Sequence, residues 1–382
     1  MAKILHVINR FGTSGGAENQ LFNNLRAFTD RSLSHSVVYI FRRDVEDPLP
    51  DVDKHGLFEV GASPRRRQII SALDDHVTAA KPDLIHCSLA DAALASRVVG
   101  RRRGIPVVES LVNISHDPVR TQDNPSVNLL KLAGHRLLDR FTMRSVDHFH
   151  ALTKAVAKSW MDNIGIPPEK ITVIPRGIDL ESIDGAASGA GVRESIGVPA
   201  DAVMLLNVAR QEPQKGQRYL LEAMPAILSR HPDAVAVFAG RDGNSSKLLR
   251  ELVTRHDLAD RVRFLGVRDD VPALLAAADV FVFPSLFEGL GVSLLEAMAA
   301  GGAACATSDA VPFDEIIDPG VTGAMFRAGD AHALAETVSM LASNRELRRS
   351  MAAAARAEIE NNYRIEAVTA RMERLYHSVL GT

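Results

Sequence analysis

Short apolar runs of strand length alternate with segments of helical periodicity, and this alternation restricts the fold more than any other feature of the sequence. In the first half the apolar runs are Ile4–Ile8, Ser36–Phe41, Leu84–Cys87, Val107–Leu111 and Phe149–Leu152. In the second half they are Val203–Ala209, Val235–Ala239, Val262–Gly266, Val280–Pro284 and Ala303–Thr307. The alternation predicts an α/β protein with doubly wound parallel sheets that carry helices on both faces.

The length of the chain and one flexible segment predict two domains. A single hydrophobic core would be unusually large for 382 residues, so two domains are expected. Residues 185–192 are rich in glycine, alanine and serine, which is typical of a linker. We therefore expect an N-terminal domain over residues 1–184 and a second domain over 193–360. Residues 361–382 are expected to form a terminal helix that docks on a neighbouring surface.

Composition and cysteine content exclude several classes of protein. Apolar residues make up 46% of the chain and charged residues 24%, which excludes disordered and low-complexity chains. Cys87 and Cys305 lie far apart in apolar runs, so the sequence gives no support to a disulfide framework and fits a reducing cytoplasm. The apolar stretches are too short to span a bilayer, and the N-terminus lacks the pattern of a signal peptide. We expect a cytoplasmic protein, soluble or peripheral at the cytoplasmic face of a membrane.

Charge and aromatic content also bear on the partners of the protein. The net charge is −3 and the chain contains one tryptophan and four tyrosines, so we expect no nucleic-acid partner. The first half is slightly basic and contains the triplets Arg65–Arg67 and Arg101–Arg103. These basic patches are candidate contacts for a membrane surface or an acidic acceptor, and solvated surface charge is the alternative.

The densest chemical signal follows the apolar run that ends at Pro284, in the sequence FPSLFEGLGVSLLEAMAAGG over residues 283–302. Glycines allow the backbone to approach a ligand closely, and free amides at the start of a helix favour an anion or a hydroxyl-rich ligand. Glu288 offers acceptors for sugar hydroxyls, and Glu296 lies about two turns further along. Ordinary helix charges are the alternative explanation of both glutamates.

These two glutamates resemble the Glu-(seven residues)-Glu signature of the family 4 retaining glycosyltransferases, which belong to glycosyl transferases group 1. Three further segments resemble family motifs in the same order along the chain. Gly15–Glu18 is similar to the Gly-Gly-x-Glu loop, Pro175–Asp179 to the Pro-Asn-Gly-Val-Asp segment, and Val208–Gly216 to the Gly-Arg…Glu-Lys-Gly segment. The resemblance implies the GT-B fold, in which two Rossmann-like domains face a cleft and a C-terminal helix packs back on the first domain.

The resemblance also implies a donor site in the second half. In the family, the residues that match Arg210 and Lys215 hold the diphosphate of the donor, and the residue that matches Glu296 binds the ribose hydroxyls. The transferred sugar is held by Glu288 and the backbone amides of Gly289, Leu290 and Gly291. A guanidinium and an ammonium after a strand suit a diphosphate and the charge that grows on it as it leaves. Taken alone, an arginine and a lysine in a polar loop would be ordinary solvated charges.

Signals for the remaining site residues are weaker. Gly16 ends a glycine-rich loop after the first apolar run and is expected at the donor, with a plain turn as the alternative. Many family members carry a catalytic histidine after the strand that matches Val107–Leu111, whereas here His116 is a displaced candidate. His86 has a structural or acceptor-side role in this interpretation, and an ordinary loop position is the alternative for both histidines. Val267 is expected near the base or sugar of the donor.

Two other patterns have the spacing of metal ligands. Asp51 and Asp53 show an Asp-x-Asp spacing, but their turn-like surroundings indicate a surface loop. His148 and His150 share one face of an expected strand without a third ligand. The resemblance implies catalysis without metal, so we expect neither a metal nor a cofactor.

These observations predict a metal-independent retaining glycosyltransferase. It would move a sugar from a UDP- or GDP-linked donor to a hydroxyl of a glycan, lipid-linked or small-molecule acceptor in polysaccharide or glycoconjugate biosynthesis. Arg210 and Lys215 would stabilise the leaving diphosphate, and Glu288 would hold the sugar. Two alternatives stay open: a nucleotide-sugar epimerase on the same fold, and a non-catalytic subunit that binds the donor.

Overall fold

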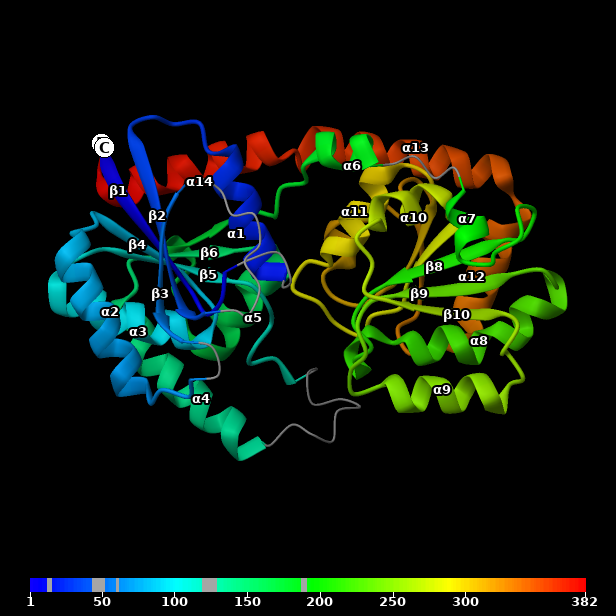
Figure 1. Cartoon of the computed structure of the whole chain (residues 1–382), viewed down its shortest axis with the longest axis horizontal. Helices are drawn as coiled ribbons and strands as arrows, with labels where there is room; N and C mark the ends of the chain where they lie inside the picture. Colours follow the sequence, from blue (N-terminus) through cyan, green and yellow to red (C-terminus); the bar gives the residue numbers. More distant parts are fainter. Residues whose placement is uncertain (12–15, 43–51, 60–61, 119–128, 187–190) are drawn as a thin grey trace. The chain divides into compact units, whose positions relative to one another are not determined.

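Two units, each built on one parallel sheet, make up the described part of the chain (Figure 1). The computed structural model describes residues 1–382 apart from 12–15, 43–51, 60–61, 119–128 and 187–190. Unit 1 contains the described residues of Met1–Pro118, Ser126–Gly177 and Ile365–Thr382, and unit 2 those of Ile178–Arg364. The prediction of an α/β protein with doubly wound parallel sheets is confirmed in both units.

The sheet of unit 1 has seven parallel strands in the order β3-β2-β1-β4-β5-β6-β7. Their bounds are β1 Ala2–Ile8, β2 Leu33–Phe41, β3 Asp53–Phe58, β4 Leu84–Ser88, β5 Val107–Leu111, β6 His148–Ala151 and β7 Ile171–Val173. The helices are α1 Gly16–Ala27, α2 Arg66–Ala80, α3 Ala90–Arg103, α4 Leu129–Thr142, α5 Lys154–Ile164 and α14 Ile365–Leu380, with short 3₁₀ turns η2 Met143–Ser145 and η3 Pro168–Lys170. From β1 the chain adds β2 and β3 on one side of the sheet and then β4 to β7 on the other side. Such sheets bind ligands at the carboxyl ends of the strands beside this point of reversal, which here lies between β1 and β4.

The sheet of unit 2 has six parallel strands in the order β10-β9-β8-β11-β12-β13. Their bounds are β8 Met204–Val208, β9 Val235–Ala239, β10 Val262–Gly266, β11 Val280–Phe283, β12 Ala304–Ser308 and β13 Ala324–Phe326. The helices are α6 Leu180–Ala186, α7 Val192–Ser195, α8 Gln217–Arg230, α9 Ser246–Arg255, α10 Val271–Ala277, α11 Val292–Ala300, α12 Ala331–Ser343 and α13 Arg345–Asn362, with 3₁₀ turns η4 Pro213–Lys215 and η5 Phe313–Glu315. Here the direction reverses between β8 and β11.

Three strands were not predicted, and all of them lie in short or polar segments. β3 has the sequence DKHGLF, and β7 and β13 have three residues each. Each of them lies at an edge of its sheet, where backbone pairing with a single neighbour is enough and an apolar run is not needed. Asp53, which the sequence assigned to a surface loop, is the exposed first residue of β3 and pairs with Ser36 of β2. Asp51 lies outside the described residues.

The terminal helix α14 belongs to unit 1, which confirms that it packs back on the first domain. Its apolar face, which includes Val368, Met372 and Leu375, packs on strand residues such as Ile4 and Leu84. Polar contacts fix its position, because Glu373 Oε1 accepts hydrogen bonds of 2.8 Å from the backbone amides of Thr29 and Asp30. Among the described helices, none combines the length and the apolar content needed to traverse a lipid bilayer.

A chain of four hydrogen bonds runs from α14 across β4, β5 and β6. Tyr376 Oη lies 2.7 Å from His86 Nδ1, and His86 Nε2 lies 2.8 Å from Ser110 Oγ. Ser110 Oγ lies 2.9 Å from His150 Nδ1, and His150 Nε2 lies 2.7 Å from the carbonyl oxygen of Ile174. A carbonyl oxygen only accepts, so His150 Nε2 donates to it. When both rings are neutral, each of the four hydrogen bonds is therefore donated by the group nearer Tyr376 and accepted by the group nearer Ile174.

Burial keeps these rings uncharged at neutral pH. It lowers the pKa of His86 to about 3 and that of His150 to about 4, because the imidazolium ion loses its hydration. Burial also lowers the pKa of His35 to about 4 and holds the pKa of His6 well below its usual value. His6 Nε2 lies 3.0 Å from His35 Nδ1. The core of unit 1 therefore contains four neutral imidazoles.

The substitution Tyr376→Phe removes the donor that faces His86 Nδ1. We expect it to lower the free energy of unfolding of unit 1 by about 1–3 kcal/mol, because a buried acceptor is left unsatisfied. Trp160 is the only tryptophan and is buried in unit 1, so its fluorescence in urea follows this unit. Tyr39→Phe is the control, since the hydroxyl of Tyr39 has no hydrogen bond to another described residue. Equal losses in the two variants would contradict the prediction.

The neutral histidines also predict a pH dependence. Their pKa values in the folded unit lie below the unfolded value of about 6.5, so the unfolded chain binds more protons between these values. The free energy of unfolding of unit 1 is therefore expected to rise with pH from about 4 to about 6.5 and to be fully developed above that range. We expect a lower urea midpoint of the Trp160 signal at pH 5 than at pH 7.5, and an unchanged midpoint would refute it.

Candidate functional site

The predicted site residues of unit 2 lie at the carboxyl ends of two neighbouring strands. β8 and β11 pair directly, and the direction of strand addition reverses between them. Arg210 follows β8, Lys215 ends the 3₁₀ turn η4, and Glu288 lies in the loop after β11. The two loops therefore meet at the edge of the sheet where α/β proteins bind ligands.

Lys215 and Glu288 form a largely buried ion pair at this edge. Lys215 Nζ lies 2.5 Å from Glu288 Oε1, and the two side chains are 15% and 10% exposed. Ser285 Oγ donates a hydrogen bond of 2.9 Å to the same carboxylate oxygen. The Nζ atom also lies 5.8 Å from the centre of the Phe283 ring. The site therefore holds an ammonium and a carboxylate that neutralise each other and are shielded from water.

Gly216 allows the two loops to approach this closely. It has a φ angle of +63°, and a Cβ atom at this position would lie 1.9 Å from the carbonyl oxygen of Pro284. The backbone amide of Leu286 donates a hydrogen bond of 2.7 Å to the carbonyl oxygen of Gln214. Glycine is thus required both by the left-handed backbone and by the contact with Pro284, which directly follows β11. As a result, Lys215 is held beside Glu288.

The loop between Glu288 and α11 has the form that the sequence predicts. The amide of Glu288 donates a hydrogen bond of 3.1 Å to the carbonyl oxygen of Val311, and Leu290 is buried. Gly291 has a φ angle of +82° and directly precedes α11, so the helix starts at the end of the glycine-containing loop. Glu296 lies in the second turn of α11 and is half-buried. Amide groups at this helix start are suited to an anion or a hydroxyl group.

Arg210 and Val267 are more exposed than the two side chains of the ion pair. The side chain of Arg210 is half-exposed, and its Nη1 atom lies 3.9 Å from Glu212 Oε1. Its backbone is fixed, because Gln217 Nε2 donates a hydrogen bond of 3.1 Å to its carbonyl oxygen. Val267 follows β10, two strands away from β8, and is 72% exposed. The structure thus joins Lys215 to Glu288 directly, whereas the side chain of Arg210 in the same loop is about half-exposed to solvent.

In unit 1, Gly16 is held by an arginine that the sequence did not assign to the site. Gly16 is the exposed first residue of α1, and its carbonyl oxygen accepts a hydrogen bond of 2.6 Å from Arg176 Nη1. Gly15 lies outside the described residues. Arg176 also lines a hollow of about 40 Å³ at the carboxyl ends of β1, β4, β5 and β6. The sequence distinguishes Arg176 by a departure from the Pro-Asn-Gly-Val-Asp segment of the family, in which an asparagine occupies this position.

His116 is part of a buried ion-pair network. His116 Nε2 lies 2.8 Å from Asp139 Oδ2, and its ring packs edge-on against Trp160 at 4.8 Å between ring centres. Arg97 donates a hydrogen bond of 2.7 Å to the other oxygen of Asp139 and pairs with Glu109. Burial alone would raise the pKa of Asp139, but the hydrogen bonds from His116 and Arg97 outweigh it and lower this pKa. The catalytic role of His116 stays a prediction.

The remaining predicted histidines are held by hydrogen bonds. His148 Nε2 lies 2.8 Å from Thr172 Oγ1, while His86 and His150 belong to the chain that starts at Tyr376. Within the described residues, no three histidine, cysteine, aspartate or glutamate side chains are grouped so that they could hold a metal ion.

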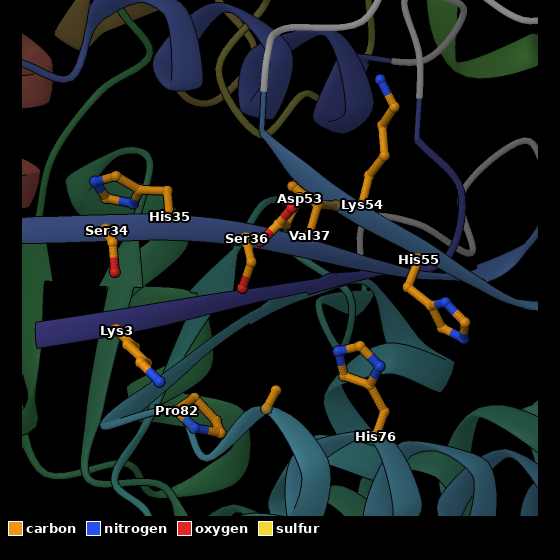
Figure 2. A pocket seen from close by; sticks show the side chains of 11 residues that line it. Lys3, Ser34, His35, Ser36, Val37, Asp53, Lys54, His55, His76 and Pro82 are labelled. Carbon is orange, nitrogen blue, oxygen red and sulfur yellow. The ribbon is translucent and has the colours of Figure 1, made fainter.

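A separate pocket of about 430 Å³ lies at the amino ends of β1, β2 and β3. Figure 2 shows Ser34 and Ser36 on the side of β2 that faces Lys3, and the rings of His55 and His76 beside one another. The two ring centres are 5.0 Å apart. Gly16 lies at the opposite end of the sheet, after the carboxyl end of β1. The pocket is therefore distinct from the end of the unit 1 sheet at which Gly16 lies.

Comparisons with known proteins identify the family. The model of the glycosyl transferases group 1 matches residues 192–358, and the model of the glycosyltransferase family 4 matches residues 14–182. An Escherichia coli UDP-Gal:alpha-D-GlcNAc-diphosphoundecaprenol alpha-1,3-galactosyltransferase is 30% identical over 58% of this chain and 56% of its own length. A GDP-mannose-dependent monoacylated alpha-(1-6)-phosphatidylinositol monomannoside mannosyltransferase of Corynebacterium glutamicum is 28% identical over 91% of this chain and 86% of its own length.

A solved structure supports the fold. The crystal structure of Anabaena Alr3699/HepE in complex with UDP and glucose has a TM-score of 0.81 and 22% sequence identity, and covers 99% of this chain and 100% of that protein. The two Rossmann-like units thus have the GT-B fold, as the sequence predicted.

The contact between Gly216 and Pro284 yields a test of the site geometry. Gly266→Ala is expected to lower the free energy of unfolding of unit 2 by about 1–2 kcal/mol through backbone strain. We expect Gly216→Ala to lower it clearly more. Both glycines have φ angles near +65°, but a Cβ atom at Gly266 meets no atom within 4 Å. The difference between the two variants in thermal unfolding therefore isolates the contact with Pro284. Equal destabilisation would mean that the two loops do not meet as described.

Proposed function

The chain belongs to family 4 of the glycosyltransferases, within glycosyl transferases group 1, and we propose that it moves a sugar from a nucleotide-diphospho-sugar to an acceptor hydroxyl with retention of anomeric configuration. The donor is a UDP- or GDP-sugar. UDP and GDP occur in the names of the two relatives, and these names support the proposal. The product is a glycan or glycoconjugate.

The ion pair of Lys215 and Glu288 is the observation that carries this proposal. A donor diphosphate competes with the carboxylate of Glu288 for the ammonium of Lys215. When Lys215 contacts the diphosphate, Glu288 is left with acceptor oxygens for the hydroxyl groups of the transferred sugar. The pair therefore serves as a preformed arrangement in which cation and acceptor separate by a small movement when the donor binds.

The other donor-side residues complete the proposed site. Arg210, which is open to solvent, adds a second positive charge to the leaving diphosphate. Glu296 binds the ribose hydroxyls, and Val267 lies near the nucleotide end of the donor. The transferred sugar also contacts the amides of Gly289, Leu290 and Gly291. Two cations stabilise the leaving group, so we propose that the reaction needs no metal, and the departing phosphate oxygen takes the proton of the acceptor.

The acceptor side belongs to unit 1. Gly16 of unit 1 is proposed at the donor, as the sequence predicts, and the hydrogen bond from Arg176 fixes it at the start of α1 beside the hollow that Arg176 lines. We assign the acceptor hydroxyl to a glycan or a lipid-linked molecule and propose that the protein works in the cytoplasm, peripheral to the cytoplasmic membrane face through basic patches of unit 1. The name of the E. coli relative contains a diphosphoundecaprenol, which supports a lipid-linked acceptor.

A thermal-shift panel of UDP, GDP and their sugar conjugates tests the donor site. A ligand at 100 times its dissociation constant adds about 2.7 kcal/mol to the stability of the protein, which is a large shift. We expect one nucleotide family to produce it and Lys215→Ala to reduce it, whereas Glu288→Ala should reduce only the additional shift given by the sugar conjugates, because Glu288 is proposed to hold the sugar. Both variants should slow cleavage of the sugar donor by about 100-fold or more. Lys247→Ala is the matched control, because Lys247 is an exposed lysine on α9.

The thermal-shift panel and the turnover assay together separate the proposal from its alternatives. Normal turnover in both site variants would refute the proposed site. Conversion of the donor sugar without any acceptor would indicate an epimerase. Nucleotide binding without release of sugar to any acceptor or to water would indicate a non-catalytic subunit.

A further inference from the structure

Two large apolar side chains project into solvent from helix α4 of unit 1. Leu137 is 58% exposed and Phe141 is 63% exposed. They are four residues apart, so they lie on the same face of the helix, one turn from each other. Asp139 points the other way and pairs with the buried Arg97. Figure 1 shows α4 at the rim of unit 1, beside α3.

Arginines flank this apolar pair. Arg136, Arg140 and Arg144 follow one another at four-residue intervals and are all exposed. The guanidinium carbon of Arg144 lies 5.8 Å from the centre of the Phe141 ring. Arg136 Nε donates a hydrogen bond of 2.8 Å to the carbonyl oxygen of Asn163, which ties this side chain to α5. Arg140 and Arg144 form no ion pair with another described residue.

The basic surface continues across a hollow of about 660 Å³ that Phe141 and Arg144 share with the end of α3. Arg101 lines the hollow and Arg102 follows it, whereas Arg103 is neutralised by an ion pair of 2.8 Å with Asp74. Asp147 is the acidic residue of the lining, and its carboxylate accepts a hydrogen bond of 2.8 Å from the amide of Val107. Two arginines, Arg101 and Arg144, thus line the hollow with one carboxylate, so the lining keeps a net positive charge. Below, the α4 surface means Leu137, Phe141, Arg140, Arg144 and Arg101.

We propose that the α4 surface docks on a bilayer that contains anionic lipids. Arginine heads meet lipid phosphates while their stems and the two apolar side chains enter the interface, as in amphipathic helices that lie on membranes. A second copy of this chain is a poorer occupant, because a two-fold contact would place these arginines against each other. The inference rests on the proposed membrane contact and does not depend on the donor chemistry.

Vesicle sedimentation with the full chain tests the proposal. We expect binding to vesicles of phosphatidylglycerol and phosphatidylcholine, weaker binding at high salt, and little binding to phosphatidylcholine alone. Leu137→Ser with Phe141→Ser, and separately Arg140→Gln with Arg144→Gln, should each weaken binding by about tenfold or more. Val321→Ser with Met340→Ser is the matched control, since both are exposed apolar residues of unit 2 outside the proposed donor site. Circular dichroism and the nucleotide-dependent thermal shift verify that each variant is folded.

A fluorescent variant gives a direct readout of insertion. Phe141→Trp places a second tryptophan on the α4 surface, while Trp160 stays buried and constant. Its emission should shift to the blue on anionic vesicles and be quenched by brominated acyl chains. Emission that does not change when the protein is bound to vesicles would overturn the proposal.

The remaining outcomes distinguish the possible failures. If the wild-type chain binds no anionic vesicles, the proposed membrane contact is wrong and this inference falls with it. If it binds and the α4 variants bind equally well, the membrane contact stands and the α4 surface is wrong. If the α4 variants only change the sedimentation coefficient of the free protein, the surface is an interface between copies. Glu288→Ala should keep full vesicle binding, so a failure of the proposed donor site can be distinguished from a failure of the proposed membrane contact.

Discussion

The close approach of Gly216 to the carbonyl group of Pro284 is the contact on which the candidate site depends. Parallel strands bring the ends of β8 and β11 to one edge, but the loops meet only because no side chain separates them. This contact holds the short turn η4 against the start of the loop that carries Glu288. An ammonium and a carboxylate are thereby kept together with little exposure to water, which strengthens their interaction and that of any charge that replaces one of them.

The sequence was sufficient to predict the two sheets and the loops that carry Lys215 and Glu288. Long apolar runs mark buried central strands, whereas the edge strands β3, β7 and β13 are too short or too polar to give such a signal. Lys215 and Glu288 were predicted at the same sheet edge, but their ion pair depends on loop geometry that no periodicity describes. The bond between Arg176 and Gly16 joins residues 160 positions apart, and no local pattern connects them.

Buried polar groups specify the arrangement of unit 1 beyond what its apolar core can do. The network of Arg97, Glu109, Asp139 and His116 links α3, β5 and α4. Arg97 pairs with both carboxylates and also donates to Thr142, and His116 is hydrogen-bonded to Asp139. Apolar contacts tolerate small shifts, whereas a buried hydrogen bond has a narrow range of distance and angle. The inner face of α4 is fixed in this way, and its outer face is free to present Leu137 and Phe141.

The attachment of α14 to unit 1 has a consequence for biosynthesis. β1 to β7 are translated first, but their apolar surface around Ile4 and Leu84 is completed by a helix that is made only after all of unit 2. During synthesis, unit 2 therefore has every strand and helix it needs before unit 1 does. Until α14 leaves the ribosome, unit 1 has all of its strands, but part of its apolar surface is uncovered and His86 lacks its tyrosine donor.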